Sequence, residues 1–210
     1  LKIDEVPLRG QRDSLVTDEL VESAGTAMIC NGNGACHNYD LDDRMCPSWK
    51  ATRDRRQTPK GRAGLMREWV TRLSEADVRS LPSQSVLMQL VTYPANIVRT
   101  LQKDSGVYDF SHEVHEAMSG CLACKSCTGQ CPIKVSVPTF RSQFLHAYYS
   151  RYARPLKDWI VGTLEYILPV AAQIPGVYNG VVNSSVGRAI FSWCGLVDSP
   201  ELSGIDPHRA

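Results

Sequence analysis

Apolar residues recur at helical rather than alternating spacing along most of this chain. The clearest stripe covers one helical face and consists of Leu65, Met66, Trp69, Val70 and Leu73. Thr58-Pro59 precedes it as a typical helix start, a capping side chain followed by proline at the first helical position. The same spacing predicts helices over residues 13–29, 84–103, 109–119, 138–153, 155–168 and 183–194. Because few segments alternate with period two, we expect an all-α fold.

Prolines and glycines interrupt this pattern in two places. Pro94 predicts a kink or break in the helix over 84–103. The uncharged stretch 166–187 is long enough to cross a membrane. However, its prolines, glycines and asparagines predict a helix end, a loop and a new helix start. We therefore expect no transmembrane segment.

Four cysteines crowd into the most specific motif of the chain, Cys121-Leu-Ala-Cys124-Lys-Ser-Cys127-Thr-Gly-Gln-Cys131-Pro132. The spacing C-x2-C-x2-C-x3-C-P is the bacterial ferredoxin pattern for a cubane iron–sulfur cluster. In that pattern the first three thiolates hold one cluster, and the fourth, which precedes proline, ligates a different cluster. The motif therefore predicts a partner motif elsewhere in the chain.

The partner motif lies upstream, in Cys30-Asn-Gly-Asn33-Gly-Ala-Cys36 followed by Cys46-Pro47. It matches the downstream run at every thiol except one, where Asn33 stands in the position of the second cysteine. Crossed ligation assigns a complete set of four thiolates to one [4Fe–4S] cluster: Cys46, Cys121, Cys124 and Cys127. The remaining set has only three thiolates: Cys30, Cys36 and Cys131.

The three-thiol set leaves three outcomes open: a three-iron cluster, a four-iron cluster with a non-cysteine or exchangeable fourth ligand, or no cluster. The asparagine amide is a poor iron ligand beside soft thiolates. His37 is a conceivable fourth ligand, although an ordinary loop histidine is the simpler interpretation. Gly32 and Gly34 permit positive φ in this loop, and we expect Gly120 and Gly129 to serve the downstream loop in the same way.

Composition narrows the class of protein. A chain of 210 residues that is 43% hydrophobic is long enough for one domain, or for one domain and a small appendage. Its net charge of +1 gives no support for nucleic-acid binding. Eight cysteines without a secretory signal peptide indicate a reducing compartment and metal ligation rather than disulfides. Cys194 stands alone, which predicts a buried apolar thiol.

Most of the chain resembles a known family. The matching segments are 30–36, 45–68, 108–127, 151–156 and 195–200. They are similar to the iron–sulfur part of the large FAD-linked oxidoreductases of the D-lactate and glycolate oxidase group. Within that group, the segments 30–36 and 108–127 look most like the bacterial D-2-hydroxyglutarate dehydrogenase type. Family members share the missing thiolate at the Asn33 position, which favours one cluster over two.

The resemblance implies an excised electron-transfer domain that is not a catalyst by itself. FAD in an absent preceding domain would oxidise a D-2-hydroxy acid, and the cluster would relay electrons to a downstream acceptor. We expect a lead-in linker and helix over 1–25 and an α-helical ferredoxin-like domain over 26–155, with its two cysteine loops at helix ends. A helical extension over 156–210 would lead to an absent downstream domain.

The expected partners are the flavin domain of the same polypeptide or complex and the electron acceptor, and a homo-oligomeric parent enzyme is one option. The expected location is the cytoplasm, and peripheral attachment to the inner membrane is the alternative. Two other functions stay open: the iron–sulfur subunit of a membrane-bound respiratory dehydrogenase, and a structural zinc-binding interaction module.

Two further groups of residues have an ambiguous role. The segment 50–67 is rich in lysine and arginine, and cations beside a negatively charged cluster raise its reduction potential. We expect one or two of them to lie near a cluster and the others to form a solvated face or a docking face for the flavin domain. His112 and His115 lie one turn apart like a metal-binding pair, but an exposed helix face is the favoured interpretation.

Overall fold

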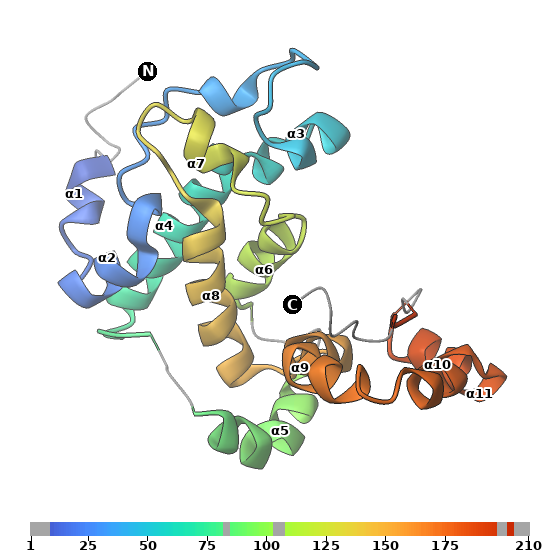
Figure 1. The fold of residues 1–210 in the computed structure, drawn as a ribbon. Helices are drawn as coiled ribbons and strands as arrows, with labels where there is room; N and C mark the ends of the chain where they lie inside the picture. Colours follow the sequence, from blue (N-terminus) through green and yellow to red (C-terminus); the bar gives the residue numbers. More distant parts are fainter. Residues whose placement is uncertain (1–8, 82–84, 103–107, 197–200, 204–210) are drawn as a thin grey trace. The chain divides into compact units, whose positions relative to one another are not determined.

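The computed structural model describes residues 9–81, 85–102, 108–196 and 201–203 (Figure 1). The chain divides into two compact units, Leu1–Ala153 and Arg154–Ala210. All regular structure in the described ranges is helical, which confirms the all-α class. The α-helices of the first unit are α1 (Arg9–Asp13), α2 (Asp18–Ala24), α3 (Pro47–Thr52), α4 (Pro59–Glu75), α5 (Val86–Leu101), α6 (Ser111–Ser119), α7 (Ser126–Gln130) and α8 (Val137–Arg151). Its short 3-10 helices are η2 (Gly25–Ala27), η3 (Ala35–His37) and η4 (Arg55–Gln57).

Helix α4 is the central element of the first unit. It starts as predicted, because the Thr58 hydroxyl accepts a hydrogen bond from the Gly61 backbone N–H at 2.9 Å and Pro59 occupies the first helical position. The predicted apolar stripe faces the core, with Met66 and Val70 fully buried. Full burial of such a side chain contributes about 1.5–3 kcal/mol, so this stripe is a main source of the stability of the unit.

Three helices pack around α4 and complete the core. Leu20 of α2, Val114 of α6 and Phe144 of α8 are all fully buried. The Phe144 ring meets Trp69 of α4 edge-on, with ring centroids 4.9 Å apart, an arrangement that aromatic pairs prefer. Figure 1 shows α3, α7 and the first turn of α4 at the same end of this unit, where the two cysteine loops lie.

Several helix boundaries differ from the prediction. The helix expected over 13–29 is divided, since α1 ends at Asp13 and α2 begins at Asp18. Thr17 lies between them and donates its hydroxyl hydrogen bond to the Arg79 carbonyl at 2.8 Å, a tertiary contact that sequence periodicity does not report. Pro94 lies inside α5 and does not break it. Helices α3 and α7 are too short to show a periodic pattern.

The second unit contains α9 (Leu156–Ala171), α10 (Pro175–Asn183) and α11 (Ser185–Trp193). The expected helix end, loop and new helix start within 166–187 are confirmed, because α9 ends at Ala171, residues 172–174 form a turn, and α10 begins at Pro175 in the preferred first helical position. The boundaries differ, since α9 continues through Pro169. Cys194 is half-buried rather than buried. No helix in the described ranges combines the length and the apolar character needed to cross a membrane.

Asp109 joins the start of α6 to the end of α8. Its carboxylate accepts hydrogen bonds from the Tyr152 hydroxyl at 2.7 Å and the Ser111 backbone N–H at 2.9 Å, and it lies 3.4 Å from the Arg151 guanidinium. Burial by itself would raise the pKa of Asp109, but these hydrogen bonds and the Arg151 charge outweigh it and hold the pKa below its ordinary value. Burial and the hydrogen bond to Asp109 raise the pKa of Tyr152 to about 12.

This carboxylate gives the unit a specific acid sensitivity. A lowered pKa in the folded state stabilises the fold above the unfolded pKa, near 4, and this contribution is lost as pH falls through the folded value. We expect Asp109→Asn to lower the free energy of unfolding by about 1 kcal/mol at pH 7 and by less near pH 3. Urea unfolding at both pH values measures this, and an equal deficit at both would contradict the assigned role.

Candidate metal centre

Four cysteines from two distant loops line one partly open cavity: Cys46, Cys121, Cys124 and Cys127. These are the four residues that crossed ligation groups into the complete set. Cys46 directly precedes α3, and the other three lie in and beside the connection between α6 and α7. The two loops are held together by a hydrogen bond of 2.6 Å from the Ser48 hydroxyl to the Gly120 carbonyl. The structure thus places the upstream thiol beside the downstream three.

The backbone around this four-thiol cavity is unusual. Positive φ occurs at Cys46 (30°), Ala123 (53°) and Lys125 (61°), none of which is glycine. The expectation for Gly120 and Gly129 is wrong, because Gly120 has φ of −73° and Gly129 lies within α7. Each such conformation costs on the order of 1–3 kcal/mol in a residue with a side chain. Strained backbone gathered in the loops of one cavity is typical of a functional site.

The four thiols differ in exposure. Cys46 and Cys127 are buried, Cys121 is half-buried and Cys124 is exposed. Burial raises the pKa of the Cys127 thiol, so this sulfur carries its proton in the metal-free chain at neutral pH. A metal bound here must displace that proton. All eight cysteines are free, and none forms a disulfide.

A second, partly open cavity is lined by the other three cysteines, Cys30, Cys36 and Cys131. Gly32 and Gly34 also line it, and their φ values of 74° and 82° confirm the predicted positive φ. Burial raises the pKa of the Cys36 thiol. The three-thiol cavity therefore joins the upstream loop to the last cysteine of the downstream motif.

Asn33 lines the three-thiol cavity in the position where the other motif has a thiol. Its side-chain oxygen accepts a hydrogen bond from the Ala35 backbone N–H at 2.9 Å, and its amide donates to the Asn31 side chain at 2.9 Å. The Asn33 side chain thus closes a local turn. His37 does not line the cavity, and its ring contacts the Thr58 hydroxyl at 3.2 Å and packs against Trp49.

The first turn of α4 lies between the two cavities. Pro59 lines both of them, Lys60 lines the three-thiol cavity and Arg62 lines the four-thiol cavity. The Lys60 backbone N–H donates to the Cys36 sulfur at 3.4 Å, and its ammonium group donates to the Gly32 carbonyl at 2.8 Å. Of the basic segment 50–67, Lys60 and Arg62 line the thiol cavities, and Arg67 lines another pocket together with Cys30 and donates to the Cys30 carbonyl at 3.3 Å. By contrast, Arg53, Arg55 and Arg56 are exposed.

His112 and His115 do not form the exposed face that the sequence suggested. Both are partly buried, and their rings contact tyrosines of α8. His112 lies 3.0 Å from the Tyr148 hydroxyl, and His115 lies 3.3 Å from the Tyr149 hydroxyl while its ring stacks on Tyr148 at 4.2 Å. The two histidines are packing residues between α6 and α8 and line neither thiol cavity.

The donor chemistry of the four-thiol cavity suits an iron–sulfur cluster. Cubane clusters take four cysteine thiolates, and four cysteines surround this cavity. Within the described ranges, no group of three or more histidine, cysteine or acidic side chains is arranged to hold a single metal ion.

The fold and these cavities define a class: an all-helical, cysteine-rich module with two thiol-lined cavities. The chain is 49% identical over 203 residues to D-2-hydroxyglutarate dehydrogenase of Pseudomonas putida, a match that covers 96% of this chain. It is 44% identical over 208 residues to the Escherichia coli protein of the same name, covering 97% of this chain. The Haemophilus influenzae protein of that name is 40% identical over 200 residues.

These matches confirm the resemblance to D-2-hydroxyglutarate dehydrogenase that the sequence motifs indicated. In each case the chain spans about a fifth (20%) of the length of the relative. No protein-family model matches the chain, and no solved structure matches it.

Two glycines of α4 test how tightly its first turn is packed beside the cavities. A Cβ at Gly61 would lie 2.1 Å from the Arg55 carbonyl oxygen, whereas a Cβ at Gly64 would meet nothing within 4 Å. We expect Gly61→Ala to lower the free energy of unfolding by about 1–3 kcal/mol through overpacking. Gly64→Ala should raise it by about 0.5–1 kcal/mol, since alanine is the better helix former. Urea unfolding of both variants measures the difference, and equal effects would contradict this packing.

Proposed function

We propose that this chain is an α-helical ferredoxin-like electron-transfer domain that holds one [4Fe–4S] cluster at Cys46, Cys121, Cys124 and Cys127. The observation that carries the proposal is the four-thiol cavity, in which one upstream cysteine joins three downstream cysteines. This grouping matches the crossed ligand sets of two-cluster ferredoxins. A bound cubane cluster takes up and releases single electrons, which is the chemistry this domain would contribute.

The chain's own residues have three tasks in this function. The four thiols from the two loops would hold the cluster, and the positive-φ backbone at Ala123 and Lys125 shapes the loop that carries three of them. Ser48 fixes the two loops to each other through the Gly120 carbonyl. Arg62 and the buried thiols exclude water from the inner side of the cavity, since each is largely inaccessible. Burial and hydrogen bonding to the sulfurs are the properties by which proteins tune such clusters.

The names of the relatives support a wider role for the protein that contains this domain. D-2-hydroxyglutarate dehydrogenases match the chain over almost its whole length. We propose that electrons come from FAD in a flavin domain after oxidation of a D-2-hydroxy acid, with D-2-hydroxyglutarate favoured, and leave to a separate acceptor. The four relatives share one name, which favours this assignment over the iron–sulfur subunit of a respiratory complex.

Cysteine variants test the ligand set directly. After anaerobic reconstitution, the wild-type chain should contain about four iron and four sulfide per chain at the complete site. Cys124→Ser should lose most of both and most of the EPR signal of the reduced cluster, because Cys124 lines the four-thiol cavity. Cys194→Ser is the matched control and should behave as wild type, since Cys194 lies in the second unit.

The alternatives give different results in the same measurement. Bound zinc without sulfide in the wild-type chain would support the structural zinc module and contradict electron transfer. Equal iron loss in the Cys124 and Cys194 variants would show that iron is not held by the assigned thiols.

The three-thiol site is tested by restoring its missing ligand. Asn33 lines the three-thiol cavity at the position of the second thiol of the other motif. We expect Asn33→Cys to raise the iron content of the reconstituted chain from about four toward eight, with a second four-iron EPR signal, because four thiolates then surround the cavity. An unchanged iron content would contradict the assignment of Cys30, Cys36 and Cys131 to a common cluster site.

A further inference from the structure

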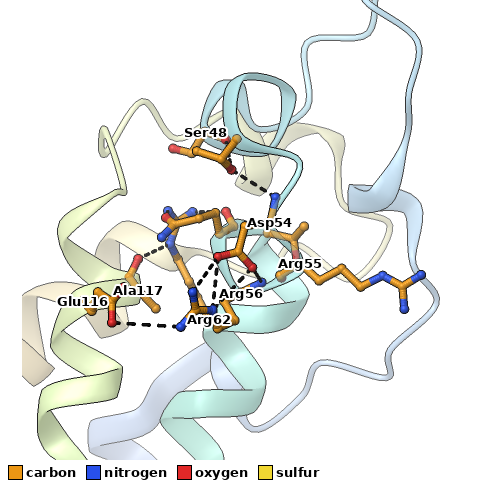
Figure 2. Close-up of polar contacts among 10 residues, drawn as sticks. Ser48, Asp54, Arg55, Arg56, Arg62, Glu116 and Ala117 are labelled. Carbon is orange, nitrogen blue, oxygen red and sulfur yellow. Dashed lines mark hydrogen bonds and ion pairs between the residues drawn. The ribbon is translucent and has the colours of Figure 1, made fainter.

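Arg62 is a buried cation at the inner wall of the four-thiol cavity. It belongs to α4, and only 1% of its surface is exposed. Its Nη1 group lies 3.8 Å from the Cys46 sulfur, within hydrogen-bonding distance for sulfur. Its other contacts are oxygens: Nε donates to the Ala117 carbonyl at 2.8 Å (Figure 2), and the remaining nitrogens donate to the backbone and side-chain oxygens of Gln57.

The charge of Arg62 has no carboxylate partner in the described part of the chain. None of the ion pairs among the described residues includes it. The carboxylate of Asp54 pairs with Arg56 instead; hydrogen bonds from Arg56 are the main reason that the pKa of Asp54 is lowered, and the Arg62 charge contributes less. Burying an arginine without an opposite charge is costly, and carbonyl oxygens compensate that cost only in part.

A second buried arginine of α4, Arg67, has the carboxylate partner that Arg62 lacks. Arg67 lies on the same helix and lines a different cavity, and it forms an ion pair with the Asp13 carboxylate. Each arginine lies near a cysteine, Arg67 near Cys30 and Arg62 near Cys46, but of the two only Arg67 has a carboxylate partner among the described residues. A cluster with four thiolates carries net negative charge, which increases on reduction. The opposite charge that Arg62 lacks among its protein contacts is therefore available from a reduced cluster in the adjoining cavity.

We propose that Arg62 is the internal counter-charge of the four-thiol cluster site and that it raises the reduction potential of the bound cluster. This inference rests on the proposed function. A cation stabilises the more negative, reduced form more than the oxidised form, so its removal lowers the potential. With Arg62 in this role, the cluster would accept electrons more readily from the preceding donor.

Arg62 also has a structural role, which the test must separate from its charge. Its contact with the Ala117 carbonyl connects α4 to α6 shortly before Cys121, and its contacts with Gln57 connect it to the segment beside Cys46. Loss of the side chain could therefore disturb both loops. A lysine keeps the charge without the planar, forked donors of arginine, whereas a glutamine keeps donors without the charge.

The experiment is an EPR-monitored redox titration of the anaerobically reconstituted chain and three variants: Arg62→Gln, Arg62→Lys and Arg56→Gln. We expect the midpoint potential of Arg62→Gln to shift to more negative values and that of Arg62→Lys to lie closer to wild type. Arg56→Gln is the matched control, because Arg56 is exposed and its charge is screened by solvent. Its potential should equal that of the wild-type chain.

Each outcome decides between the two roles. A wild-type potential in cluster-loaded Arg62→Gln overturns the proposal. If Arg62→Gln retains no iron and sulfide, Arg62→Lys decides: retention with lysine supports a requirement for charge, and loss in both variants overturns it in favour of a purely structural role. Absence of iron and sulfide from the wild-type chain would instead contradict the proposed function itself.

Discussion

The first turn of α4 is the constraint on which both thiol-lined cavities depend. Pro59 lies in the wall of each cavity, the Lys60 backbone N–H donates to Cys36, and Arg62 approaches Cys46. A helix N-terminus carries unpaired N–H groups and a partial positive charge, which favour negative groups beside it. The same helix buries Met66 and Val70 in the core. Packing of the core therefore sets the position of the turn that separates the two sites.

If a cluster binds as proposed, this arrangement would couple its binding to folding. The loops around the four-thiol cavity contain positive-φ residues, and the cavity wall contains an arginine without a carboxylate partner in the described part of the chain. Both features are costly in the metal-free protein. Bonds from iron to thiolates and the negative charge of a cluster would offset both costs. Cluster binding would then contribute to the free energy of folding.

Cysteine spacing predicted the grouping of the thiols because crossed ligation is a rule about sequence order. The start of α4 was predictable from Thr58-Pro59, whose capping geometry is local. The apolar stripe indicated the buried face of α4 because residues three and four positions apart lie on the same face of a helix. The predictions that were wrong concern tertiary contacts. The sequence predicted that His112 and His115 lie on an exposed helix face, but tyrosines of a later helix cover them.

The buried state of Arg62 was also missed, although a signal existed. Arg62 precedes Met66 and Val70 by four and eight residues, so it lies on the buried face of α4. A charged residue on an apolar helical face is a stronger indication of a functional site than its membership in a basic segment. The positive φ at Ala123 and Lys125 could not be predicted from the sequence, because glycine is the residue that usually indicates this conformation.

The most direct test of the central claim is an iron anomalous-difference map from crystals of the anaerobically reconstituted chain. We expect iron density inside the cavity lined by Cys46, Cys121, Cys124 and Cys127, beside the first turn of α4. Iron located away from these four sulfurs, or an anomalous signal at the zinc edge alone, would contradict it.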